Sequence, residues 1–375
     1  MRIIVDLCHP AHVHLFRYML EAWRREGVQV LVFAREKDIT RSLLDSYGIA
    51  HQVLAPAGVG TAGRARELVR REIAMFRAAR RFRPAIITGS SPNAARVARL
   101  VGAKSLVFCE DDAKIVPQYR WTAYPFASAI VTPQCLAYEN YGVRHFTYPA
   151  YQKLFYLHPN RFTPDRTIFS HLGLGDNERF ALVRLSSLQA HHDRGARGMS
   201  EDLLRSVVAM CRPGIHLFIT SERPLPEEFE PLRLPIPPER IHDALASAEF
   251  FLGDSQSMTV ESALLGTPAF KINTFAGIIS VIRELEEYGL AFGYRPGQED
   301  ALLDELNRFL ETPDGKARFQ KRRAGMLAEK IDPLPWFLEI VRMFGGGAGV
   351  REVKAWSDRA LNSGRFGAAG KGIGG

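Results

Sequence analysis

A segment near residue 260 combines three features that suit the binding of a phosphorylated sugar. Residues 250–252 are apolar and predict a buried strand, which is followed by a short polar loop and a helix. A helix start binds anions, because its N–H groups are unpaired and its dipole is positive there. A carboxylate about one turn further on can accept hydrogen bonds from a sugar diol. We therefore predict a nucleotide-sugar site formed by Asp254, Ser255, Gln256, Ser257, Met258 and Glu261. The simpler alternative is an ordinary turn in which Asp254 caps the helix and Glu261 is solvated.

Three histidines follow the first apolar strand of the chain. His9, His12 and His14 lie at the predicted carboxyl end of strand 3–5, just before a helix. We expect them to contact phosphate or an acceptor, with one of the histidines, His12 before the others, or Asp6 acting as a base. The alternative is that His9 and His14 are structural and that His14 starts the helix. No zinc site is predicted, because no Cys or carboxylate partner has a recognisable ligand spacing.

An acidic triplet follows another predicted strand, residues 105–109. Glu110, Asp111 and Asp112 are candidate general bases, since clustered acids raise one another's pKa. A solvated acidic loop that caps the next helix is the alternative.

The second half of the chain offers further ligand groups at strand ends. Arg184 ends the predicted strand 180–185 and can pair with a diphosphate. Ser221 follows strand 216–220 and can contact a base or diphosphate. The residues His191, His192 and Asp193 are adjacent, so their side chains diverge, and we predict a loop there instead of a metal triad.

The elements that must position these residues alternate between strands and helices. In the first half the predicted strands are 3–5, 28–33, 50–54, 85–88, 105–109, 129–132 and 144–148. In the second half they are 180–185, 216–220, 249–253 and 269–272, with Ser200 as the N-cap of a helix that ends near Met210. This rhythm is typical of α/β proteins with doubly wound parallel sheets, in which ligands bind at the carboxyl ends of strands.

The pattern divides the chain into two Rossmann-like domains. We predict an acceptor-side domain at 1–150, a linker at 151–166 and a nucleotide-sugar-binding domain at 167–344. Helices are expected near 277–288, 299–311, 314–329 and 333–344. The Gly- and Ala-rich residues 345–375 predict a disordered tail. Two such domains whose sheet ends face a central cleft describe the GT-B architecture.

Composition narrows the class of protein. The chain has 375 residues, of which 46% are hydrophobic, yet no apolar run approaches the roughly 20 residues of a membrane span. The start of the chain has no signal-peptide pattern, and the four cysteines form no CxxC pair. We therefore expect a cytoplasmic protein with reduced thiols.

Most of the net charge of +8 lies in one helix and in the tail. Residues 64–83 carry eight Arg and two Glu, a net charge of +6, and residues 351–375 carry a net charge of +3. In helix 61–83 the apolar residues Leu68, Val69, Ile73, Phe76, Ala79 and Phe82 alternate with arginines. This pattern is commonly a helix packed on a sheet with a solvated face. The alternative is peripheral contact with anionic lipid at the inner membrane face. No recognition motif supports binding to nucleic acid.

The segment around Asp254 resembles the nucleotide-binding motif of non-hydrolysing UDP-GlcNAc 2-epimerases. In that family an Asp-Ser-Gly-Gly loop holds the diphosphate, a Glu seven residues after the Asp binds ribose, and Gly-x-Pro follows. The residues that match this spacing here are Asp254, Ser255, Glu261, Gly266 and Pro268.

A closer resemblance covers about residues 1–345. It is to an uncharacterised bacterial and archaeal family of predicted GT-B glycosyltransferases. The matching residues are Asp6, His9-Pro10, His12, His14-Leu15-Phe16, residues 156–165, Val183-Arg184, His191-His192-Asp193 and Gly253-Asp254-Ser255. The resemblance implies a fold and a ligand class, but no particular reaction.

The chain also departs from the epimerases at positions that matter for chemistry. The epimerases carry an Asp after the fourth strand, where this chain has Gly89-Ser90-Ser91. Their His-Arg-Arg-Glu motif is replaced by residues 184–187, Arg-Leu-Ser-Ser. Their catalytic Glu after the fifth strand has a counterpart in the acidic triplet. Epimerisation needs acid and base groups at these places, so the departures disfavour an epimerase.

The sequence therefore predicts a metal-independent, inverting glycosyltransferase with no cofactor. It would transfer sugar from a nucleotide sugar, expected to be a UDP-sugar, to a cell-envelope, polysaccharide or lipid-linked acceptor. A helix start and an arginine would stabilise the departing UDP in place of a cation. An epimerase-like isomerase and a non-catalytic nucleotide-sugar-binding protein are the alternatives.

Overall fold

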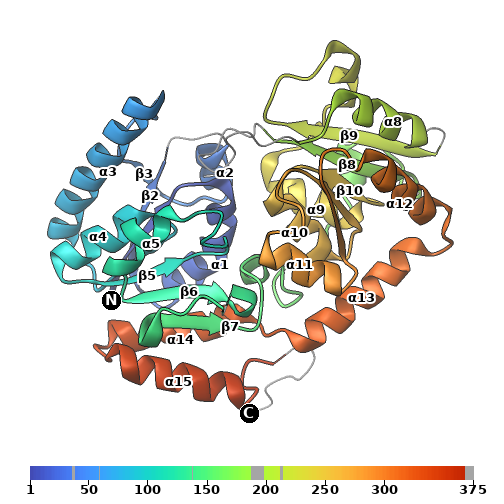
Figure 1. Cartoon of the computed structure of the whole chain (residues 1–375). Coiled ribbons are helices and arrows are strands. Elements are labelled where there is room, and N and C mark those ends of the chain that lie inside the picture. Colours follow the sequence, from blue (N-terminus) through green and yellow to red (C-terminus); the bar gives the residue numbers. More distant parts are fainter. Residues whose placement is uncertain (36–38, 59, 137, 187–197, 212–213, 368–375) are drawn as a thin grey trace. The chain divides into compact units, whose positions relative to one another are not determined.

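The chain folds into two compact units, which are described separately below. The computed structural model describes residues 1–35, 39–58, 60–136, 138–186, 198–211 and 214–367. Unit 1 comprises Met1–Asn160 and Lys330–Gly375, and unit 2 comprises Arg161–Glu329 (Figure 1).

Unit 1 is built on a parallel sheet with the strand order β3-β2-β1-β4-β5-β6-β7. The strands pair in parallel throughout, and the order reverses direction between β1 and β4. Each strand predicted in the first half of the chain is confirmed, although β3 is shorter than expected. The strands are β1 (Arg2–Leu7), β2 (Gln29–Ala34), β3 (Gln52–Val53), β4 (Ile86–Gly89), β5 (Lys104–Phe108), β6 (Ala129–Pro133) and β7 (His145–Tyr148).

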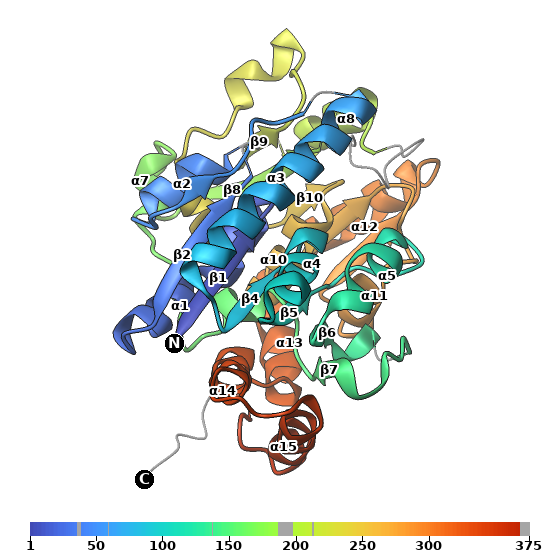
Figure 2. The same cartoon turned by 90° about the vertical axis from the view of Figure 1, so that its left-hand side faces the viewer.

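Helices cover both faces of this sheet. Figure 2 looks onto α3 and α4, which pack through Met75, Ala79 and Val97 against Ile4 and Ile87 of the sheet. On the other face, Phe16 of α1 meets Phe108 of β5 at 5.5 Å between ring centroids. The helices from the first part of the chain are α1 (Pro10–Arg25), α2 (Thr40–Ser46), α3 (Gly60–Phe82), α4 (Pro92–Val101), α5 (Gln118–Thr122) and α6 (Leu154–Leu157), with short 3-10 turns at η1 (Tyr124–Phe126), η2 (Gln134–Leu136) and η3 (Gly142–Arg144).

The C-terminal part of the chain corrects two predictions. Helix α14 (Pro333–Gly345), which we assigned to the second domain, packs in unit 1. The ring of Phe337 contacts that of Phe108 at 4.6 Å between centroids, and the ring of Trp336 contacts that of Tyr148 at 5.2 Å. The predicted disordered tail is wrong for α15 (Val350–Asn362). This helix packs on α14, where Trp336 Nε1 donates to Ser357 Oγ at 3.0 Å.

The predicted linker also contains ordered structure of unit 1. Tyr151, Leu154 and Phe155 are fully buried, and α6 lies within this stretch. The division between the units falls after Asn160.

Unit 2 contains a second parallel sheet, with the order β12-β11-β10-β8-β9. The four predicted strands are confirmed, and the edge strand β12 was not predicted. The strands are β8 (Arg179–Leu185), β9 (Ile215–Ser221), β10 (Phe251–Gly253), β11 (Ala269–Ile272) and β12 (Ala291–Tyr294).

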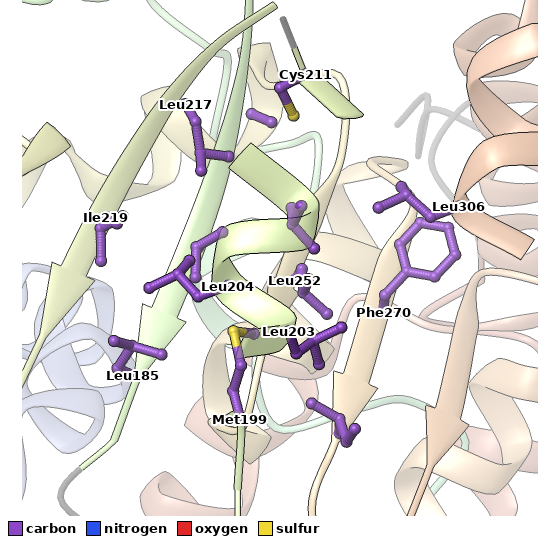
Figure 3. Packing of buried hydrophobic residues seen from close by; sticks show 14 of the residues in the cluster. Leu185, Met199, Leu203, Leu204, Cys211, Leu217, Ile219, Leu252, Phe270 and Leu306 are labelled. Atoms are coloured by element: carbon purple, nitrogen blue, oxygen red, sulfur yellow. The ribbon is translucent and has the colours of Figure 1, made fainter. Parts of the chain in front are cut away.

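One hydrophobic cluster of unit 2 lies between this sheet and helices α8 and α12. Figure 3 shows Leu203 and Leu204 of α8 in one cluster with Ile219, Leu252 and Phe270 of the strands. Ser200 caps α8 as predicted, since its Oγ accepts from Leu203 N at 3.2 Å. The helices are α7 (Ile168–His171), α8 (Glu201–Cys211), α9 (Ile241–Ser247), α10 (Gln256–Leu265), α11 (Ser280–Glu287), α12 (Glu299–Glu311) and α13 (Gly315–Glu329), with 3-10 turns at η5 (Glu227–Leu232) and η6 (Pro238–Arg240).

Candidate functional site

The loop between β10 and α10 is fixed by Asp254. This residue is 2% exposed, and its Oδ1 accepts a hydrogen bond from Ser186 N at 2.6 Å. Asn273 Nδ2 donates to its carbonyl at 3.0 Å. Burial raises the pKa of Asp254, and the bond from Ser186 opposes that shift. Asp254 therefore joins the ends of β8, β10 and β11 and positions the loop.

Two glycines allow this close packing. A Cβ on Gly253 would lie 2.8 Å from the carbonyl oxygen of Arg184 on the neighbouring strand. Gly266 ends α10 in the left-handed region, with φ of 76°.

The start of α10 presents backbone donors. Ser255 is the N-cap, with φ of −80° and ψ of 121°, and its Oγ accepts from Met258 N at 3.5 Å. The first helical hydrogen bond runs from Thr259 N to Ser255 O at 3.1 Å. The N–H groups of Gln256 and Ser257 therefore belong to the helix start, where no carbonyl of the same helix can accept from them. Such a start favours an anion, and the predicted anion site stays a prediction.

Glu261 lies on the same side of α10 as Ser257, four residues earlier. Its side chain is 6% exposed and lies 3.5 Å from Nε2 of His242 in α9. The carboxylate of Glu261 therefore lies next to the imidazole of a neighbouring helix, about one turn into α10. Nothing in the sequence pattern indicated His242, which is 19 residues away.

The other predicted ligands of unit 2 bond to neighbouring groups. Arg184 donates through Nη2 to Glu222 Oε1 and through Nη1 to Thr220 Oγ1 at 2.8 Å. Ser221 Oγ donates to the carbonyl of Arg223 at 2.6 Å and so closes a local turn. Ser187 and the predicted loop with His191, His192 and Asp193 lie outside the described residues.

The histidines of unit 1 surround the start of α1. His9 is its N-cap, since Nδ1 accepts from Ala11 N at 3.2 Å, so the alternative in which His14 starts the helix is wrong on that point. His12 Nδ1 accepts from Cys8 N at 3.3 Å. A neutral imidazole with this bond carries its proton on Nε2, which can donate but cannot accept. His14 is buried, stacked on Tyr156 at 5.5 Å and bonded to Tyr47, as a structural residue would be.

The acidic triplet is mostly internal. Glu110 is 5% exposed and accepts from Lys153 Nζ and from Gln152 N at 3.0 Å. Burial raises the pKa of Glu110, and Lys153 opposes that shift. Asp112 is 3% exposed and accepts from Tyr138. Asp111 is the only member of the triplet with a half-exposed side chain, which makes it the best placed of the three to meet a substrate.

A buried ion pair that the sequence did not predict lies at the ends of β1 and β4. Arg71 Nη2 donates to Asp6 Oδ1 at 2.6 Å, with the two side chains 4% and 0% exposed. Ser91 Oγ also donates to Asp6. Asp6 is therefore not available as a base. Its partner Arg71 belongs to the basic helix, four residues from the buried Glu67, which pairs with Arg35.

Among the residues that the structure describes, no group of three His, Cys, Asp or Glu side chains is arranged to hold a metal ion.

Solved structures with the same fold cover nearly the whole chain. The S. aureus MnaA–UDP co-structure covers 91% of this chain and 95% of its own, with a TM-score of 0.63 at 12% identity. The UDP-GlcNAc 2-epimerase from Neisseria meningitidis bound to UDP-GlcNAc covers 97% and 100%, with a TM-score of 0.63 at 10% identity. The spinosyn forosaminyltransferase SpnP covers 91% and 99%, with a TM-score of 0.61 at 14% identity.

At these identities the likeness shows the fold alone, which is α/β and GT-B-like with two Rossmann-like units, as predicted. No curated protein matches the chain in sequence. The model of the family described as "Protein of unknown function (DUF354)" matches residues 1–292, and this protein belongs to that family.

Proposed function

We propose that this protein is a glycosyltransferase that takes a sugar from a nucleotide sugar, a UDP-sugar, and transfers it with inversion to a cell-envelope or polysaccharide acceptor. The observation that carries the proposal is the start of α10, where backbone donors and the Glu261 carboxylate occur on one helix. Glycosyltransferases and UDP-GlcNAc 2-epimerases with the same fold support the ligand class.

In this proposal unit 2 binds the donor. The N–H groups of Gln256 and Ser257 hold the diphosphate and stabilise its growing charge as the sugar leaves, so no metal ion is required. Glu261 accepts hydrogen bonds from the ribose hydroxyls, with His242 3.5 Å from its carboxylate. Arg184 uses two of its five N–H donors on Glu222 and Thr220, and others remain to join the diphosphate.

Unit 1 provides the groups for the acceptor. Asp111 is the favoured base, because Glu110 is neutralised by Lys153 and Asp112 is buried with Tyr138. His12, with its proton on Nε2, is suited to donate to an acceptor oxygen.

A ligand titration tests the donor site. We expect UDP to bind the wild type and to bind Glu261→Ala about 10- to 100-fold more weakly, since hydrogen bonds to a charged group are lost. The exposed Glu287 of α11 provides a matched control, and Glu287→Ala should leave the affinity unchanged. Isothermal titration calorimetry on the full chain measures all three. Equal affinities for the two variants would contradict the ribose-clamp assignment.

The neighbouring epimerases favour an isomerase as the second candidate. The chain argues against it, because Gly89-Ser90-Ser91 supplies no acid and Glu110 is paired with Lys153. Incubation with a single UDP-sugar and no acceptor separates the two, since only an isomerase turns over alone. Tight binding without turnover under any condition would indicate a binding protein.

We further propose that one face of α3 contacts anionic lipid. Val69 and Ile73 are 56% and 46% exposed, and the exposed Arg66, Arg70 and Arg77 share their side of the helix. No helix in the described parts of the chain is both long and apolar enough to cross a membrane, so the contact would be peripheral.

Sedimentation with vesicles tests the lipid contact. We expect the chain to pellet with phosphatidylglycerol-containing vesicles and not with pure phosphatidylcholine, because the arginines supply the attraction. Val69→Asp combined with Ile73→Asp should abolish pelleting. Leu100→Asp, at a 66% exposed position of α4, is the control and should have no effect. Equal binding to both vesicle types would contradict the proposal.

A further inference from the structure

Unit 2 has a pocket that the proposed donor site does not use. It lies between β12, the end of α12 and the start of α13, with a volume of about 230 Å³. Figure 1 labels the two helices. An engineered cavity of about 150 Å³ in another protein holds benzene, so this one has room for a single ring with a substituent.

The floor of the pocket is aromatic. Phe292, Phe309 and Phe319 line it, with ring centroids 6.0 Å apart for Phe292 and Phe319 and 5.8 Å apart for Phe309 and Phe319. Phe292 and Phe309 are only half-buried, so parts of their rings remain open to a ligand. An aromatic group placed there would gain both apolar burial and ring contacts.

The rim of the pocket is cationic. Arg308, Arg318 and Arg322 line it together with a single acid, Glu305, which pairs with Arg308 at 2.8 Å. Arg322 lies 4.9 Å above the Phe319 ring and donates to the carbonyl of Gly289 at 2.7 Å. The Arg318 side chain has no hydrogen bond or ion pair with any part of the chain that the structure describes. The lining therefore carries a net charge of +2, which an anionic group would complement.

We propose that this pocket binds a small aromatic anion, a single ring carrying a phosphate or carboxylate group. The ring lies on the three phenylalanines, and the anion pairs with the Arg318 guanidinium, with Arg322 next to it. The site is separate from the start of α10, because α13 contacts the opposite, C-terminal end of that helix. Gln320 and Arg323 of α13 donate to the last carbonyls of α10, at 3.0 Å to Leu265 and 2.7 Å to Leu264.

Calorimetric titration of the full chain with phenyl phosphate tests the proposal. We expect phenyl phosphate to bind at least about tenfold more tightly than inorganic phosphate or benzyl alcohol, because each of these lacks one of the two interactions. Arg318→Ala should weaken the binding of phenyl phosphate about tenfold and leave the affinity for benzyl alcohol unchanged. Lys321→Ala removes an exposed positive charge from the same helix outside the pocket lining and should change neither affinity.

Each other outcome overturns the proposal. Equal affinities for phenyl phosphate and inorganic phosphate would mean that the ring contributes nothing. Equal effects of Arg318→Ala and Lys321→Ala would place the ligand elsewhere, including at the start of α10. Absence of phenyl phosphate binding would show that the pocket is not a site for this class of ligand. Arg318 is exposed, so its variant is expected to fold normally.

Discussion

At the carboxyl edges of the two sheets, the buried carboxylates have partners of different kinds. In unit 1, buried carboxylates pair with cationic side chains, as Asp6 does with Arg71 and Glu110 with Lys153. In unit 2, the buried carboxylate of Asp254 accepts from a backbone N–H, and the next element is a helix start. The buried carboxylates of the first edge are therefore paired with side-chain cations, and that of the second edge is held by a backbone N–H.

This difference predicts which changes each edge tolerates. A buried ion pair costs desolvation and is stable only while both partners are present. A backbone donor is kept by almost any side chain and is removed only by proline. Unit 1 should therefore be sensitive to loss of charge, and unit 2 to loss of an N–H group.

The largest expected effect comes from breaking the pair between Asp6 and Arg71. Arg71→Met leaves a fully buried carboxylate without its cation and should lower the free energy of unfolding by about 3–5 kcal/mol. Urea unfolding followed by tryptophan fluorescence measures this, because all four tryptophans, Trp23, Trp121, Trp336 and Trp356, lie in unit 1.

Two further variants isolate the ion pair. Arg70→Met removes an exposed charge one residue away and should cost no more than about 0.5 kcal/mol. The double change Asp6→Asn with Arg71→Met removes both charges and should restore more than half of the loss. If Arg71→Met and Arg70→Met cost the same, charge pairing does not hold this edge.

The same contrast explains what the sequence could predict. The start of α10 was predictable because all its parts are local, from the strand through the cap Ser255 to Glu261. The two ion pairs of unit 1 join residues that are far apart in the sequence, by 65 positions for Asp6 and Arg71 and by 43 for Glu110 and Lys153. No periodicity links the members of either pair. Only the folded sheet brings such residues together.

The strands were likewise predictable where the local sequence alone defines them. Continuous apolar runs predicted the buried strands correctly. The missed strand β12 is a four-residue edge strand with a glycine and three half-buried positions, which gives no such run. In the tail, flanking glycines concealed α15, whose buried Val353, Ser357 and Ala360 recur at helical spacing.

A smaller effect is expected from His145, which adds a pH dependence to unit 1. Burial, and next the nearby Lys354, lower the pKa of His145 to about 4. The unfolded chain therefore takes up this proton first, and stability is lost as the pH falls from about 6.5 to about 4, by at most about 3 kcal/mol. His145→Gln should flatten this part of the profile, measured by tryptophan fluorescence in urea at each pH. A wild-type profile no steeper than that of the variant would show that His145 is not responsible.

The smallest expected effect, about tenfold in affinity, tests whether unit 2 binds its ligand through backbone N–H groups at the start of α10. Gln256 is the first residue of α10, a position where proline fits a helix, and the extended Ser255 before it suits a following proline. Gln256→Pro should thus keep the fold but remove one N–H donor, and UDP should bind about tenfold more weakly by calorimetry. Gln256→Ala loses the side chain and keeps the donor, so its affinity should stay within about twofold of the wild type. If Gln256→Ala weakens the binding of UDP as much as Gln256→Pro does, the side chain of Gln256 and not the helix start holds the ligand. The two sheet edges would then both depend on side chains.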